Sequence, residues 1–305
     1  MGSVSIGDCL GEGLGLIRRR PVAVLTWGLI QTLVTSGAFT IMAPLYQAFF
    51  AQIASAGKTG GAPPDIGAMM HFQSVSWLIS IGNYAVAVVL YCGVFRSVLY
   101  PEQRRFAYLR LGAAEFFLFI VVIMALLGFG AAIFALFIPV FIVAGIGMVT
   151  HAAYLGVMLG IVGSLAAIAA LIYLALRFSL VGPMTVQEGK FVLLESWRLT
   201  RGKVGSLFLL ALCIVAILFV GEVIIGAVLI LIGAGALSSA AGGLGNLAAF
   251  FRQPLAEILS GLAPFLVGLA VVWIPFSGCA LALMGAPWAR AYRDLVGPDL
   301  AATFS

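Results

Sequence analysis

Long runs of apolar residues, broken by short polar segments, dominate the sequence. Each run has 20 or more residues, which as an α-helix crosses the roughly 30 Å hydrocarbon core of a bilayer. Such runs predict an all-α, polytopic membrane protein with six transmembrane helices. The expected spans are residues 22–44, 75–99, 116–140, 155–181, 206–234 and 262–285.

The third and fourth spans are the hardest to separate, because no charged residue occurs between Phe116 and Leu176. Pro139 and the glycines at 145 and 147 predict that the chain turns near 141–153. Three helices in this stretch would instead give seven spans in all.

The distribution of Lys and Arg separates these alternatives. Six spans place 14 of the 16 basic residues on one side of the membrane and leave only Lys58 and Arg252 on the other. Seven spans would break this division. Basic residues collect in cytoplasmic loops. We therefore expect a multi-pass membrane protein with a cytoplasmic N-terminus and a cytoplasmic C-terminus.

The composition leaves little sequence for a soluble domain. Of the 305 residues, 63% are apolar and only 9% are charged, and the mean hydropathy is +1.18. A soluble domain needs more charge on its surface, so residues 1–305 are interpreted as a single membrane domain. Arg18–Arg20 before an apolar run resemble a signal peptide, but that run is too long for a cleaved one and reads as a retained first span.

Three segments that precede pairs of spans are expected to form short cytoplasmic helices at the membrane interface. Residues 5–17 are amphipathic, with Ser5 as the N-cap. The others are Pro101–Leu111 and Glu188–Arg201, the latter ended by Gly202. The arrangement suggests three hairpin repeats, and LGEGLGLIRRR resembles LLESWRLTRGK. Short apolar segments also match by chance, so a true repeat stays an open alternative.

Glu222 is the one acidic residue deep inside a predicted span. A charge at mid-membrane costs about 2.5–3.5 kcal/mol on insertion scales. The carboxyl group is therefore expected to face other helices, with Asn83 and Gln31 as partners at similar depth. Two interpretations remain: a proton or cation site, or a hydrogen-bonded group that ties helices together.

Other candidate residues favour structure over chemistry. Gly156, Gly160 and Ser164 recur every four residues, which lets helices approach closely. The four cysteines form no CxxC pattern, and His71 and His151 lie on separate loops, so no metal or cofactor is expected. No phosphate-binding loop or Ser/His/Asp set is present, and we expect no enzyme activity.

The stretch RFSLVGPMTVQEGKFVLLESWRLTRGKVGSLFLL resembles the glycerophosphoryl diester phosphodiesterase membrane-domain family and its alphaproteobacterial relatives. The segments GLIRRRPVAVL and RRFAYLRLGAAEF are similar to the corresponding parts of those proteins. The resemblance implies a membrane part without the separate hydrolase domain, so it implies no hydrolase activity. The matching residues are a turn, a helix end and an interfacial anchor: Pro183, Glu188, Gly189, Ser196, Trp197, Leu199, Thr200, Arg201 and Gly202.

These patterns favour a non-enzymatic membrane module that organises or accompanies a membrane complex. The alternative is a small transporter with Glu222 as a proton or cation site. A membrane-embedded lipid enzyme would need paired polar residues at one depth, which the sequence lacks. The expected partners are membrane lipids, with anionic headgroups on the cytoplasmic side, and another protein or a second copy in the membrane. No nucleic acid is expected.

Overall fold

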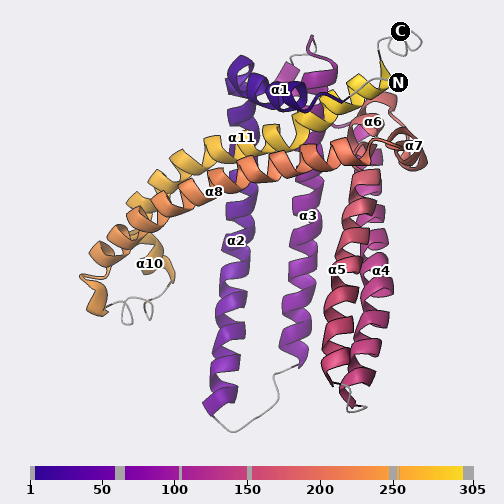
Figure 1. Ribbon diagram of the computed structural model, residues 1–305. Coiled ribbons are helices and arrows are strands. Elements are labelled where there is room, and N and C mark those ends of the chain that lie inside the picture. Colours follow the sequence, from indigo (N-terminus) through magenta and orange to yellow (C-terminus); the bar gives the residue numbers. More distant parts are fainter. Residues whose placement is uncertain are drawn as a thin grey trace. The chain divides into compact units, whose positions relative to one another are not determined.

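The computed structural model describes residues 4–58, 66–102, 105–149, 153–246, 253 and 255–297. In these ranges it contains six helices long and apolar enough to cross a membrane, and no strand (Figure 1). The all-α, six-span prediction is confirmed. The stretch without charges forms two long helices rather than three. The long helices are α2 (Pro21–Lys58), α3 (Ile66–Leu99), α4 (Ala113–Val149), α5 (Ala153–Arg177), α8 (Val204–Ala240) and α11 (Ala263–Val296).

The remaining elements are short. They are α1 (Ile6–Arg19), the 3-10 turn η1 (Arg105–Tyr108), α6 (Val181–Glu188), α7 (Leu193–Leu199), the 3-10 turn η2 (Leu244–Asn246) and α10 (Leu255–Gly261). The helix expected over residues 5–17 is α1. The Ser5 hydroxyl caps it by accepting a hydrogen bond from the Asp8 N–H at 3.4 Å.

Two of the three expected short helices differ from expectation. The described residues of Pro101–Leu111 form no α-helix, because Phe106, Ala107 and Tyr108 all have positive φ, which an L-residue cannot hold in a right-handed helix. The helix expected over Glu188–Arg201 starts only at Leu193. Gly189 ends α6 in the left-handed conformation (φ 61°), and its N–H bonds to the Thr185 carbonyl.

The chain divides into two compact units, and several helices contribute to both. Unit 1 comprises Met1–Glu12, Val88–Ala211 and Gly285–Ser305. In it α4 packs along α5 and also contacts α6, which in turn contacts α7. Gly156 lies so close to α4 that a Cβ there would be 2.7 Å from the Ala144 carbonyl oxygen. The smallest side chain therefore sets the distance between the two helices.

Unit 2 comprises Gly13–Ala87 and Leu212–Met284. Its closest helix contact joins α2 to α11, where Gly28 meets the Ile274 carbonyl and Gly278 meets the Val24 carbonyl. The Ser277 hydroxyl lies 3.2 Å from the Gly28 carbonyl oxygen and 3.3 Å from the Thr32 hydroxyl. Two glycines thus allow the backbones to touch, and two buried hydroxyls fix the register of the pair.

Candidate functional site

The candidate site begins at the C-terminal end of α5. The last carbonyls of a helix have no partner within the helix. Here the Arg177 carbonyl accepts hydrogen bonds from the hydroxyls of Ser196 (2.9 Å) and Thr200 (3.3 Å), both fully buried. The segment around α7 therefore closes the end of α5, which explains why the sequence places two hydroxyl residues four positions apart there.

The side chain of Arg177 is held by the same segment. Its Nε and Nη2 donate to the Tyr173 hydroxyl at 3.0 and 2.6 Å, and Nη1 donates to the Trp197 carbonyl at 3.2 Å. The guanidinium carbon also lies 4.8 Å from the centroid of the Trp197 ring and 5.1 Å from that of Tyr173. Arg177 is only 9% exposed, yet no carboxylate of the described residues pairs with it.

A pocket of about 490 Å³ opens beside this group. It is lined by Arg177, Trp197, Arg198 and Arg201, and Arg198 and Arg201 are exposed. Among the described residues, the lining thus carries three positive charges and no acid. Its volume falls within the range of roughly 300–1,000 Å³ that is typical of small-molecule sites. The arrangement suits an anion, because guanidinium groups offer planar pairs of N–H donors.

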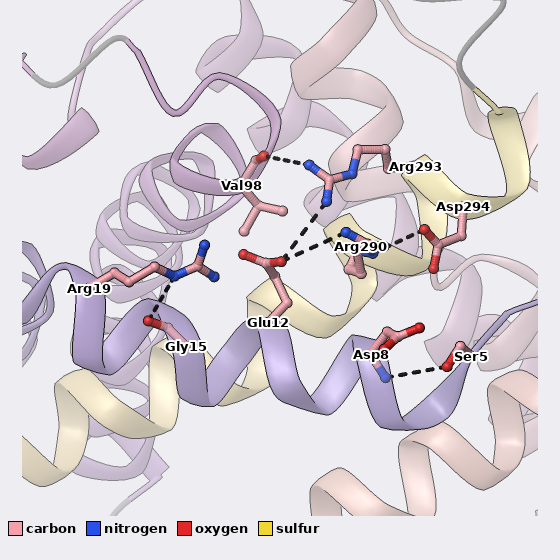
Figure 2. Close-up of polar contacts among 9 residues, drawn as sticks. All are labelled: Ser5, Asp8, Glu12, Gly15, Arg19, Val98, Arg290, Arg293 and Asp294. Atoms are coloured by element: carbon pink, nitrogen blue, oxygen red, sulfur yellow. Dashed lines mark hydrogen bonds and ion pairs between the residues drawn. The ribbon is translucent and has the colours of Figure 1, made fainter.

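Two other arginines in the described part of unit 1, the buried Arg96 and the half-buried Arg290, do have acidic partners. Arg96, near the end of α3, forms an ion pair with Glu115 in the first turn of α4, and both side chains are buried. Figure 2 shows a second cluster, in which Glu12 of α1 lies 4.0 Å from Arg290 and 3.9 Å from Arg293 of α11. Arg290 also pairs with Asp294 at 3.0 Å, and Arg293 contacts the Val98 carbonyl at 3.5 Å.

The ion pairs of Glu12 hold α1 beside the C-terminal end of α11. The reactivity of the Cys9 thiol can be used to measure this contact. Cys9 is 0% exposed, and burial, with a smaller effect of the Asp294 carboxylate, raises the pKa of its thiol to about 12. Only the thiolate reacts readily with maleimides. A thiol with this pKa has about a thousandfold less thiolate near neutral pH than one with an ordinary pKa.

We expect Glu12→Ala to speed maleimide labelling of Cys9 at least tenfold, because α1 loses its ion pairs and the thiol becomes accessible. The measurement uses a chain in which Cys92, Cys213 and Cys279 are replaced by alanine. Arg18→Ala, an exposed change on the same helix, is the control and should leave the rate unchanged. Equal rates in the parent chain and Glu12→Ala would mean that the cluster does not hold α1 in place.

Glu222, Asn83 and Gln31, the polar residues expected to meet inside the membrane, make no hydrogen bond with one another in the described chain. Glu222 lies exposed on α8, and no described hydrogen bond or ion pair joins it to another residue. Asn83 is half-buried on α3, and the Gln31 amide donates to the Thr35 hydroxyl of its own helix at 3.3 Å. The expectation that Glu222 faces other helices stays a prediction, and its neighbours Phe219, Val223 and Ile224 on α8 are exposed apolar residues.

The structure also shows where most of the other residues singled out from the sequence lie. Gly156 and Gly160 face Ala144 of α4, Gly163 meets Val140, and Ser164 is half-buried. Glu188 and Gly202 are exposed, the latter at φ 78°. Ser196, Trp197, Thr200 and Arg201 all belong to the candidate site. His71 is exposed on α3, whereas His151 and Arg252 lie outside the described residues.

Sequence reasoning missed the central residue of the site. A basic residue at the end of a span is expected to reach lipid headgroups, so the sequence alone does not indicate that Arg177 is buried. The available signal was its spacing from Tyr173, four positions earlier on the same helix face, which suits a stacked pair. Its second partner, Trp197, is 20 positions away, and local patterns cannot reveal a contact at that separation.

Comparison with protein-family models, with curated proteins and with solved structures gave no match to this chain. In the part of the chain that the structure describes, no group of three or more His, Cys, Asp or Glu residues is placed to hold a metal ion. The resemblance of the 177–210 stretch to a known membrane domain stays a prediction.

Proposed function

We propose that this chain is a non-enzymatic module of the bacterial inner membrane that accompanies a membrane complex, with both termini in the cytoplasm. The observation that carries the proposal is the exposed carboxyl group of Glu222 on α8. A polar group in the hydrocarbon region needs a partner, and the described chain supplies none. A second protein or a second copy of this chain would supply it.

An ionised carboxylate facing lipid at mid-span costs about 2.5–3.5 kcal/mol or more, and even a neutral carboxyl loses the hydrogen bonds that it makes in water. Hydrogen bonds between transmembrane helices return about 0.6–1.7 kcal/mol each. An acid on an otherwise apolar surface therefore favours association of α8 with another polar intramembrane group.

The proposed orientation rests on the 14-to-2 division of basic residues between the two sides. It places α1, α7 and the arginine-lined pocket at the cytoplasmic surface, where anionic headgroups lie. Transport through a site at Glu222 has less support, because Asn83 and Gln31 make no described contact with it.

Photo-crosslinking in living cells tests the association. A photoreactive amino acid at Phe219, one turn from Glu222 on roughly the same face, should give a crosslinked protein product. Leu231, nine positions along α8 and so on the opposite side, is the control position. Both side chains are exposed. The Phe219 product should fall about three- to tenfold with Glu222→Leu and persist with Glu222→Gln, which keeps a hydrogen-bonding amide.

Two results would contradict the proposal. One is crosslinking to lipid alone at both positions. The other is a protein product from Phe219 that Glu222→Leu leaves unchanged. A folded protein that loses its cellular role specifically in Glu222→Gln would instead favour proton exchange, and hence transport, because glutamine preserves a hydrogen bond but cannot carry the proton.

A further inference from the structure

We infer that the pocket lined by Arg177, Trp197, Arg198 and Arg201 binds the phosphate group of a lipid with net negative charge, a phosphomonoester or a phosphodiester without a cationic headgroup, at the membrane surface. The inference does not depend on Glu222 or on association with a partner. It rests on the charge of the lining, the state of Arg177 and the surroundings of α7.

The first observation concerns the charge of Arg177. A buried charge is normally paired, and the buried Arg96 and the half-buried Arg290 have carboxylate partners. Arg177 instead has the Tyr173 hydroxyl, the Trp197 carbonyl and two aromatic rings. These groups orient the guanidinium but do not neutralise it, and three hydrogen bonds do not use all of its N–H donors. An anion in the pocket would supply the missing negative charge.

The other two arginines complete the argument for phosphate. Arg198 lies in the last turn of α7 and Arg201 in the turn that follows it, and both line the same pocket. Three guanidinium groups around about 490 Å³ match an anion with several oxygen atoms. A carboxylate, with only two oxygens and one charge, would use fewer of the donors.

The apolar residues of α7 and its approach favour a lipid as the source. Leu194 is 73% exposed, and Phe191 and Trp197 are also exposed. Leu194, Trp197 and Arg198 share one face of α7 at spacings of three and four, and Arg201 follows in the turn after the helix. This face of α7 is therefore apolar at one end and basic at the other. A lipid has the same arrangement, with acyl chains beside a phosphate headgroup.

Binding is measured on the purified full chain in detergent by native mass spectrometry, titrated separately with phosphatidylglycerol, phosphatidylcholine and inorganic phosphate. Phosphatidylglycerol should bind most tightly. The variant Arg198→Ala/Arg201→Ala should weaken that binding about thirtyfold, since two basic groups near a surface each contribute about a factor of five. Arg198→Lys/Arg201→Lys keeps the charge but loses the planar donors, and it should show an intermediate loss.

The matched control is Arg110→Ala/Lys190→Ala, which removes two exposed charges of the same unit that do not line the pocket. It should change binding less than threefold. Circular dichroism and gel filtration confirm that each variant is folded. Tight binding of inorganic phosphate that competes with phosphatidylglycerol would keep the phosphate site but assign it to a soluble ligand.

Equal losses in the pocket variant and the control variant would overturn the inference, because they would reflect general surface charge. Equal affinity for phosphatidylglycerol and phosphatidylcholine would overturn it as well. Neither result bears on the crosslinking at Phe219. The phosphate site and the proposed association can therefore fail separately.

Discussion

Replacing Gly278 by alanine is expected to separate α2 from α11. A Cβ at this position would fall inside the contact distance of the Val24 carbonyl oxygen, and both groups belong to helix backbones that cannot rotate away. Overpacking of this kind costs about 3 kcal/mol or more, at the upper end of the usual range. The change also displaces Ser277 from the Thr32 hydroxyl and the Gly28 carbonyl.

The fraction of monodisperse protein after heating in detergent measures this effect, and it should drop sharply for Gly278→Ala. Gly268→Ala is the matched control on the same helix, because a Cβ there meets nothing within 4 Å. Gly28→Ala and Gly37→Ala form the equivalent pair on α2. The controls should be unchanged or slightly more stable, since alanine is the better helix former. Equal stability of Gly278→Ala and Gly268→Ala would refute the close approach of the two helices.

Removing the carboxyl group of Glu115 is expected to have the second large effect. Glu115→Ala leaves the guanidinium of Arg96 buried without its partner. Breaking a buried ion pair from one side typically costs about 3–5 kcal/mol, because the remaining charge stays desolvated. The same heating assay should therefore show strong destabilisation, with loss of the contact between the end of α3 and the start of α4.

The double variant Arg96→Met/Glu115→Leu separates the two possible causes. Replacing both charges by apolar side chains of similar size removes the unpaired charge, so stability should return to near that of the parent chain. Glu195→Ala, which removes an exposed acid of the same unit, is the control and should have little effect. A double variant as unstable as Glu115→Ala would show that packing, not charge pairing, accounts for the loss.

The candidate site contains contacts that local sequence patterns do not predict. The sequence resemblance includes Ser196, Trp197 and Thr200, and these residues do lie in the site. The pocket, however, depends on Arg177 meeting Trp197 across the turns around α6. Gly189 makes this return possible by taking a positive φ, and the sequence alone suggested a helix running straight through Val192.

The sequence by itself determined the class of this protein. Runs of more than 20 apolar residues can be buried only in a bilayer, and in the bilayer their backbone groups must bond within each helix, so six spanning helices follow from length and hydropathy. Tertiary structure alone decided which polar groups meet. Arg96 pairs with Glu115, Glu12 contacts α11, and the buried Arg177 packs against Trp197 rather than a carboxylate. Each of these contacts joins residues that are far apart in sequence. These contacts depend on how the helix ends pack, whereas the hydrophobic pattern fixes only that the helices exist.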